Sequence, residues 1–186
     1  IVEHIDSAGV HSGDAMMCIP PWRLSNKIIE TINDYTKKIA LTFNVKGPFN
    51  LQFLIHDDHV YVIELNIRAS RSMPFVSKLV KTNLISLASK AILDKPLPKV
   101  PENKWQKIHN YGIKVPQFSF MQLDGADIAL GVEMQSTGEA ACFGNSFYDA
   151  LSKGLTSVGY NLPDKGTALV TAGGSQNKEK LLLSIA

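Results

Sequence analysis

The chain has 186 residues, of which 45% are apolar and 19% are charged. These values are ordinary for a globular protein, so the composition excludes wholesale disorder. The formal net charge of +2 is too small to favour nucleic acid or a membrane surface as a partner. No apolar run approaches the roughly 20 residues needed to span a bilayer. Cys18 and Cys142 fit no metal or redox spacing, which favours a reducing, cytoplasmic location.

The first part of the chain predicts a loop, a short strand and a long helix. Residues 7–14 are rich in glycine and polar side chains, which is typical of a loop. The apolar run at 16–19 predicts a strand. Apolar side chains then recur at three- and four-residue spacing over 28–43, which predicts a helix, and Ser25 is a suitable N-cap for it.

Two strand-like segments, 50–55 and 60–66, flank a polar turn and predict a β-hairpin. We expect Gln52 to lie opposite Glu64, because this register gathers the polar side chains, with Asn66, on one face. The same register predicts apolar pairs on the other face, namely Phe53 with Ile63 and Ile55 with Tyr61.

The remaining segments predict a mixture of helices and strands. The expected elements, in chain order, are a helix after Pro74, a helix at 84–93, a proline-rich connector at 96–101, strands at 112–121 and 131–143, a helix at 147–158, a strand at 167–172 and a helix from 177.

The polar face of the hairpin is a candidate metal site. One carboxylate, Glu64, and two amides, Gln52 and Asn66, are hard oxygen ligands that suit Mg²⁺ or Mn²⁺. Arg68 and Arg71 follow directly and could bind phosphoryl oxygens. The alternative is an ordinary solvent-facing strand with arginines that form surface salt bridges.

The glycine-containing segment at 9–13 is a second candidate site. Its backbone amides could approach a phosphate or nucleotide closely, although it fits neither a Walker A loop nor a dinucleotide fingerprint, and a tight turn is the alternative. His11 could act as a base or a ligand, or be a hydrogen-bonded structural residue. His56 and His59 could bind a metal, or belong to a solvated turn.

Several segments together resemble the large synthetase component of carbamoyl-phosphate synthase, in order over about residues 1–165. The segments that carry the resemblance are 3–5, 8–14, 47–52, 64–71, 74–78, 114–120 and 133–139. The Ala-Gly-Val-His-Ser-Gly-Asp run at 8–14 resembles the second ATP-grasp half of that component, which phosphorylates carbamate. The runs at 66–72 and 114–120 look more like the eukaryotic type that serves pyrimidine synthesis.

The resemblance implies a mixed α/β fold. Residues 1–95 would form the C-terminal lobe of an ATP-grasp domain with an antiparallel sheet, and 96–165 a smaller α+β subdomain. Residues 166–186 would be the truncated start of a regulatory, methylglyoxal-synthase-like domain. The lobe that carries the flexible phosphate loop would precede Ile1, so we expect the chain alone to bind ATP weakly and to be inactive.

The resemblance also implies roles for the candidate residues. Gly9, Val10, His11 and Ser12 would lie along the nucleotide. Gln52 and Glu64 would contact both ATP and the metal, and Asn66 would be a further metal ligand. Arg68 and Arg71 would be catalytic, near the transferred phosphate. The implied reaction converts carbamate and ATP into carbamoyl phosphate and ADP, with Mg²⁺ or Mn²⁺.

The implied partners are the remaining domains of the same component and a glutamine amidotransferase subunit or domain, in pyrimidine or arginine biosynthesis. Two other hypotheses remain open. One is a different ATP-grasp carboxylate ligase such as biotin carboxylase, against which the run at 8–14 argues. The other is a regulatory or interaction fragment with no catalysis of its own.

Overall fold

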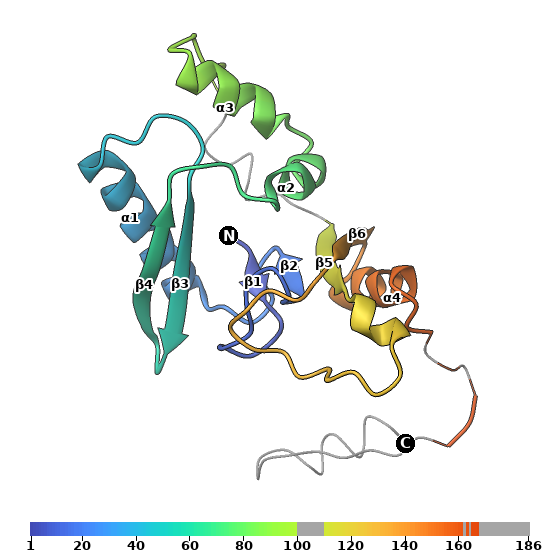
Figure 1. The fold of residues 1–186 in the computed structure, drawn as a ribbon. Coiled ribbons are helices and arrows are strands. Elements are labelled where there is room, and N and C mark those ends of the chain that lie inside the picture. The colour runs from blue at the N-terminus through green and yellow to red at the C-terminus, as the bar shows by residue number, and fades with distance from the viewer. Residues whose placement is uncertain (100–109, 162, 164, 168–186) are drawn as a thin grey trace.

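The computed structural model describes residues 1–99, 110–161, 163 and 165–167. Figure 1 shows a two-stranded hairpin with one long helix on one side and a four-stranded sheet on the other. The elements in chain order are β1 (Glu3–His4), β2 (Met17–Ile19), α1 (Asn26–Thr42), β3 (Asn50–His56), β4 (His59–Asn66), α2 (Met73–Leu79), α3 (Leu84–Ile92), β5 (Tyr111–Gln117), the 3₁₀ helix η1 (Ser119–Gln122), β6 (Gly138–Gly144) and α4 (Phe147–Ser157).

The larger sheet is antiparallel throughout, with strand order β1-β2-β5-β6. Cys18 of β2 pairs with Ile113 of β5, which joins segments that are far apart in the sequence. The sheet therefore takes two strands from before residue 96 and two from after it. This arrangement brings the N-terminal loop beside the C-terminal part of the chain.

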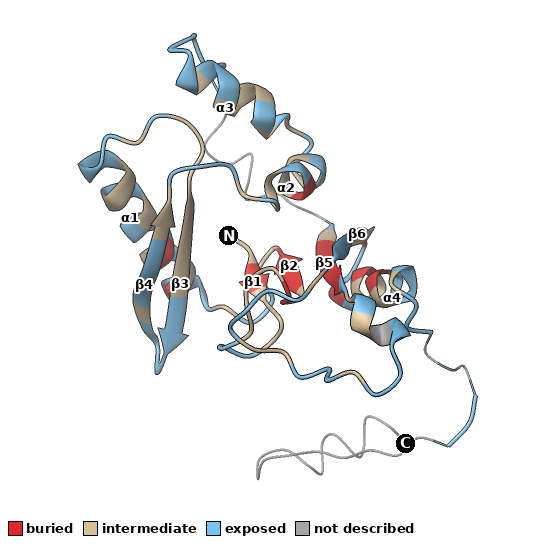
Figure 2. Cartoon of the chain, viewed as in Figure 1, coloured by how far each residue is buried: buried red, intermediate tan, exposed pale blue. Residues whose placement is uncertain are grey.

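The main core lies between this sheet and α4, as Figure 2 shows. Ile113 and Val115 of β5 point toward the helix and are almost fully buried. Gly154 of α4 allows this close approach, because a Cβ atom there would lie 2.7 Å from Val115 Cγ2. Trp22 closes one end by stacking on Phe147, with ring centroids 4.2 Å apart.

The hairpin has the predicted pairing at its open end, where Gln52 lies opposite Glu64. The pairings predicted nearer the turn are wrong, because the register shifts by one residue between Gln52 and Phe53. The observed pairs are Phe53 with Val62, Leu54 with Tyr61 and Ile55 with Val60, in place of Phe53 with Ile63 and Ile55 with Tyr61.

The turn explains this shift. Asp57 and Asp58 both have positive φ, 47° and 60°, and form a two-residue turn that pairs His56 with His59. With this turn, the strand pairing near the tip is offset by one residue from the pairing of Gln52 with Glu64. A β-bulge must absorb the difference.

The helices predicted within the described residues are confirmed. Ser25 Oγ accepts a hydrogen bond from the backbone N–H of Ile28 and caps α1, which packs against β4. The Asn83 side chain caps α3 in the same way, by accepting from the N–H of Ser86. In the described part of the chain, no helix is both long and apolar enough to cross a membrane.

Two strand predictions are too long. The strand expected at 112–121 ends at Gln117, and the chain turns into η1 with Phe118 and Phe120 stacked 4.8 Å apart. The strand expected at 131–143 begins only at Gly138, because the preceding residues donate their backbone N–H groups to other partners, described below. The strand predicted at 167–172 and the helix from 177 lie outside the described residues, apart from residue 167.

Candidate functional site

The glycine-containing loop of residues 9–14 forms a compact turn. His11 Nδ1 accepts a hydrogen bond from the backbone N–H of Gly13 at 3.0 Å, so Nε2 is the ring nitrogen that carries the proton of the neutral imidazole. The backbone carbonyl of His11 accepts from the N–H groups of Asp14 and Ala15, at 2.9 and 3.1 Å. These bonds hold the imidazole against its own loop.

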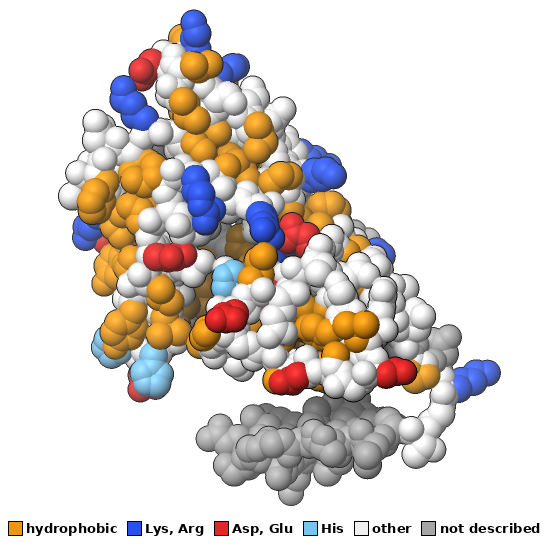
Figure 3. Space-filling model, in the orientation of Figure 1, with side chains coloured by type: hydrophobic (Ala, Val, Ile, Leu, Met, Phe, Trp, Pro, Cys, Tyr) orange, Lys and Arg blue, Asp and Glu red, His pale blue; other side chains and the backbone are white. Residues whose placement is uncertain are grey.

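A hydrogen bond joins this loop to the hairpin. Gln52 Nε2 donates to Ser12 Oγ at 3.2 Å, across 40 positions of sequence. The structure therefore brings together side chains from both candidate sites. Figure 3 shows basic, acidic and histidine side chains gathered around a hollow between the hairpin and the four-stranded sheet.

The three proposed metal ligands share one face of the hairpin. Gln52 lies opposite Glu64, and Glu64 and Asn66 are two residues apart on β4. Asn66 Nδ2 donates to Glu64 Oε1 at 2.7 Å, so the amide oxygen of Asn66 is the atom that could bind a cation. One carboxylate and two amide oxygens fit Mg²⁺ or Mn²⁺, which usually complete their coordination with water and phosphate oxygens.

The two candidate arginines differ in position. Arg71 Nη1 lies 3.6 Å from Met134 Sδ, so this guanidinium reaches the segment that leads into β6. Arg68 Nη1 donates to the carbonyl of the next residue, Ala69, at 3.4 Å, and no longer-range hydrogen bond or ion pair holds it among the described residues. Both side chains are exposed. The structure thus brings Arg71 to the loop region and leaves Arg68 on the surface near the end of β4.

Gly9 and Val10 lie at the start of the same loop, and Gly9 has a φ of 105°, a conformation that favours glycine. No hydrogen bond joins either residue to the hairpin in the described part of the chain. His56 and His59 lie at the far tip of the hairpin. Across the described ranges, no three His, Cys, Asp or Glu side chains cluster as a metal site would require, so a site at this histidine pair has no structural support.

Asp14 is a buried carboxylate that anchors the loop to the segment before β6. The sequence did not indicate it as a site residue. Asp14 is 1% exposed and accepts hydrogen bonds from the backbone N–H groups of Gln135 and Ser136, at 2.8 and 2.9 Å. Burial alone would raise the pKa of Asp14, but the hydrogen bonds from Ser136 and Gln135 outweigh burial and lower it. Asp14 is therefore a firmly ionised anchor between the loop and the segment before β6.

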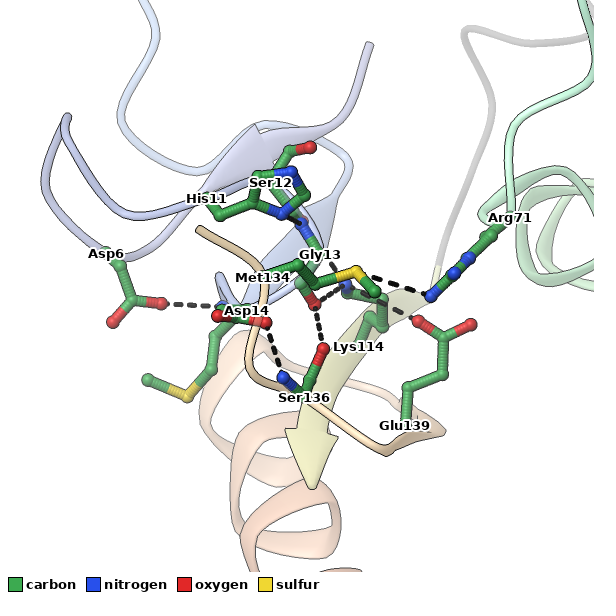
Figure 4. A network of polar contacts seen from close by, with 11 residues as sticks. Asp6, His11, Ser12, Gly13, Asp14, Arg71, Lys114, Met134, Ser136 and Glu139 are labelled. Atoms are coloured by element: carbon green, nitrogen blue, oxygen red, sulfur yellow. Dashed lines mark hydrogen bonds and ion pairs between the residues drawn. The ribbon is translucent and has the colours of Figure 1, made fainter. Parts of the chain in front are cut away.

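A buried cation, Lys114 of β5, lies beside this anchor (Figure 4). Its side chain donates to the backbone carbonyls of Gly13 and Ser12, at 3.1 and 3.5 Å, and pairs with Glu139 at 3.5 Å. Burial lowers the pKa of Lys114, and the charge of Glu139 opposes this shift. Sequence reasoning missed Lys114, although a lysine between Ile113 and Val115 in a buried strand was a usable signal.

Comparison with solved structures defines the class of fold. The ADP complex of purK, an N5-carboxyaminoimidazole ribonucleotide synthetase, matches 84% of this chain and 43% of its own, with a TM-score of 0.59 and 15% identity. The biotin carboxylase subunit of pyruvate carboxylase matches 80% of this chain and 43% of its own, with a TM-score of 0.60 and 13% identity. At such low identity the likeness concerns the fold alone. The chain has part of the fold of ATP-grasp enzymes, as the family resemblance implied.

Sequence comparison narrows the class to a family. The family described as carbamoyl-phosphate synthase L chain, ATP binding domain, matches residues 2–100. Multifunctional protein pyr-3 of Neurospora crassa is 47% identical over 186 residues, all of this chain and 10% of that protein. Multifunctional protein URA2 of Saccharomyces cerevisiae is 47% identical over 185 residues, 8% of its length. The carbamoyl phosphate synthase large chain of Sulfurisphaera tokodaii is 48% identical over 186 residues, 17% of its length.

The chain belongs to the carbamoyl-phosphate synthase large-chain family and includes part of its ATP-binding domain. It spans a tenth or less of the length of the two fungal relatives. The family resemblance drawn from the sequence is therefore confirmed, and ATP is the nucleotide of this domain family.

Proposed function

We propose that this chain supplies the metal- and nucleotide-binding wall of the site that phosphorylates carbamate in a carbamoyl-phosphate synthase. The product would be carbamoyl phosphate for pyrimidine or arginine biosynthesis. The proposed partners are the other domains of the same enzyme and a glutamine amidotransferase subunit or domain. We infer the carbamate half from the resemblance of residues 8–14.

The observation that carries the proposal is the hydrogen bond between Gln52 and Ser12. It places the loop proposed to follow the nucleotide beside the hairpin face that carries Glu64 and Asn66. A nucleotide that lies along the loop can therefore present its phosphates to those oxygen ligands. Neither element alone would form such a site.

The side chains have separable roles in this proposal. Gln52, Glu64 and Asn66 would hold Mg²⁺ or Mn²⁺, which neutralises charge on the β- and γ-phosphates when bound. Ser12 and His11 would bind and orient the nucleotide along the loop. Arg71, and Arg68 from the surface side, would stabilise the charge that develops on the transferred phosphoryl group. Phosphoryl transfer depends on this positioning and charge neutralisation and needs no protein nucleophile.

The test uses the full-length enzyme and separates its two phosphorylation steps. Formation of ATP from ADP and carbamoyl phosphate reports the carbamate step in reverse, and bicarbonate-dependent ATP hydrolysis reports the other step. We expect Glu64→Ala to lower the first activity at least about a hundredfold, since a metal ligand supplies several kcal/mol of transition-state stabilisation. The second activity should stay within about threefold of the wild type.

Glu30→Ala is the matched control, because Glu30 is an exposed carboxylate on α1. It should leave both activities unchanged. A Glu64→Ala enzyme that still forms ATP from carbamoyl phosphate at a near-normal rate would refute the proposal. Selective loss of bicarbonate-dependent hydrolysis would instead assign the chain to the other half of the enzyme.

A further inference from the structure

A buried lysine lies directly under the loop that we propose to follow the nucleotide. Lys114 comes from the middle of β5, where Ile113 and Val115 on either side face the α4 core. The Lys114 side chain points the opposite way, toward the loop, and the residue is only 3% exposed. Burial of an ammonium group is costly unless the group is paired and hydrogen-bonded, so its partners indicate why it is there.

Its contact partners come from two separate segments. The ammonium group contacts the carbonyls of Ser12 and Gly13 in the loop and Glu139 on β6. Asp14 and Arg71 lie close enough to influence its charge electrostatically. Two acidic and two basic side chains therefore form a balanced group beneath the loop, with Lys114 at its centre (Figure 4).

The contacts of Lys114 bear directly on the geometry of Ser12. Two successive carbonyls, those of Ser12 and Gly13, turn toward the same cation. Because the peptide unit is planar, this fixes the backbone on both sides of Gly13. The Ser12 hydroxyl, on the same residue, meets Gln52 on the hairpin. Removal of the cation would take its donor from the Ser12 carbonyl, whereas the Gly13 carbonyl would keep its hydrogen bond from Ser136 Oγ at 3.3 Å. The Ser12 side chain would then be held less firmly in its present direction.

We propose that Lys114 is a positioning residue for nucleotide binding, which holds the backbone of Ser12 and Gly13 so that the loop lies against Gln52. This inference rests on the proposed function of the loop. Lys114 need not contact the nucleotide, because it acts through the loop backbone. Loss of Lys114 should therefore weaken the enzyme's interaction with the nucleotide in the ground state and the transition state alike.

The test is Lys114→Met in the full-length enzyme, assayed by ATP formation from ADP and carbamoyl phosphate. Methionine keeps most of the side-chain volume and removes the charge and its donors. We expect the KM for ADP to rise about tenfold, the value of one hydrogen bond to a charged group, while kcat stays within about threefold. A lysine with a purely structural role would lower the melting temperature and leave the KM of the folded enzyme unchanged, and that result would overturn the proposal.

Two further variants keep the test decisive. The double variant Lys114→Met/Glu139→Gln also removes the carboxylate that Lys114→Met alone leaves unpaired. The raised KM for ADP should persist in it. If Lys114→Met does not fold, the single variant Glu139→Gln tests the proposal instead. We expect its KM for ADP to rise about threefold, because the ion pair with Lys114 is lost. An unchanged KM would contradict the inference.

Glu64→Ala in the same series separates the two proposals. Loss of activity in Glu64→Ala with a wild-type KM in Lys114→Met would overturn only the role of Lys114. Retained activity in Glu64→Ala would overturn the proposed function, and the inference about Lys114 with it.

Discussion

The side-chain amide of Gln52 donates to the hydroxyl of Ser12 at 3.2 Å, and this contact joins the β3–β4 hairpin to the glycine-containing loop. Both segments carry residues that the family resemblance associates with ATP. The contact makes them one surface, with Lys114 and Asp14 fastening the loop from the side of the four-stranded sheet.

The two ends of this hydrogen bond should respond differently to mutation. Ser12→Ala removes one neutral hydrogen bond, so we expect the KM for the nucleotide to rise about three- to tenfold. Gln52→Leu removes the same bond and a proposed metal ligand, and should lower kcat/KM at least about a hundredfold. Steady-state kinetics of ATP formation from ADP and carbamoyl phosphate measure both. Ser152→Ala, at an exposed position of α4, is the control and should leave the kinetics unchanged. Equal effects of Ser12→Ala and Gln52→Leu would argue against a metal role for Gln52.

Gly13 has little room for a side chain while Met134 keeps its observed position. A Cβ atom at Gly13 would lie 2.7 Å from Met134 Sδ and 3.1 Å from His11 Nδ1. We expect Gly13→Ala to lower the free energy of unfolding by about 1–3 kcal/mol through overpacking. Met134→Ala should recover much of this loss in the double variant, because it removes the nearest clash. Chemical denaturation of the four proteins gives the coupling, and additive effects would show that the two residues do not touch in solution.

Asp14 should stabilise the fold most at neutral pH. Its pKa is lowered in the folded chain, so its contribution is present above the unfolded pKa and is lost as pH falls through the folded value. We expect Asp14→Asn to cost about 1.5–3 kcal/mol at pH 7, because an amide cannot replace the carboxylate that accepts the two backbone N–H groups.

The difference in unfolding free energy between wild type and Asp14→Asn should shrink in acid, where the wild-type carboxyl is also protonated. Urea denaturation over a series of pH values measures it. Asp124→Asn, at an exposed position, is the control. A difference that stays constant with pH would show that the charge of Asp14 does not stabilise the fold.

The two cysteines should differ in reactivity. Burial, and then the negative charge of Glu3, raises the pKa of the Cys18 thiol to about 11. Cys18 is therefore protonated at neutral pH and inert toward alkylation. Cys142 is only half-buried, with its Sγ 3.2 Å from Ser157 Oγ, and should be modified first by iodoacetamide, as followed by mass spectrometry. The Cys142→Ser protein should then react only on unfolding, and rapid labelling of that protein would contradict the buried position of Cys18.

The sequence predicted the elements of the hairpin and the helices because their patterns are local. Ser25 and the apolar spacing after it identify α1, and the polar face of β3 and β4 sets Gln52 opposite Glu64. The bulge beyond Gln52 was not predictable from alternation alone. It follows from the positive φ values of Asp57 and Asp58, which fix a different register at the turn.

The sequence predicted that Glu64 and Asn66 share one face of a strand, because only two positions separate them. The support of the candidate site from β5 and β6 was missed, because Lys114 meets the loop across about a hundred positions of sequence. Local patterns also misplaced the start of β6. Gln135 and Ser136 were expected in a strand, but their N–H groups bind the distant carboxylate of Asp14.

The central claim is that the oxygens of Gln52, Glu64 and Asn66 hold the metal that accompanies the nucleotide. The most direct measurement is anomalous diffraction from crystals of the full-length enzyme grown with Mn²⁺ and ADP. The account predicts a manganese peak about 2.0–2.3 Å from a carboxylate oxygen of Glu64, with amide oxygens of Gln52 or Asn66 in the same coordination shell. Nucleotide bound along residues 9–12, with manganese on its phosphates but no protein ligand from this hairpin face, would contradict it.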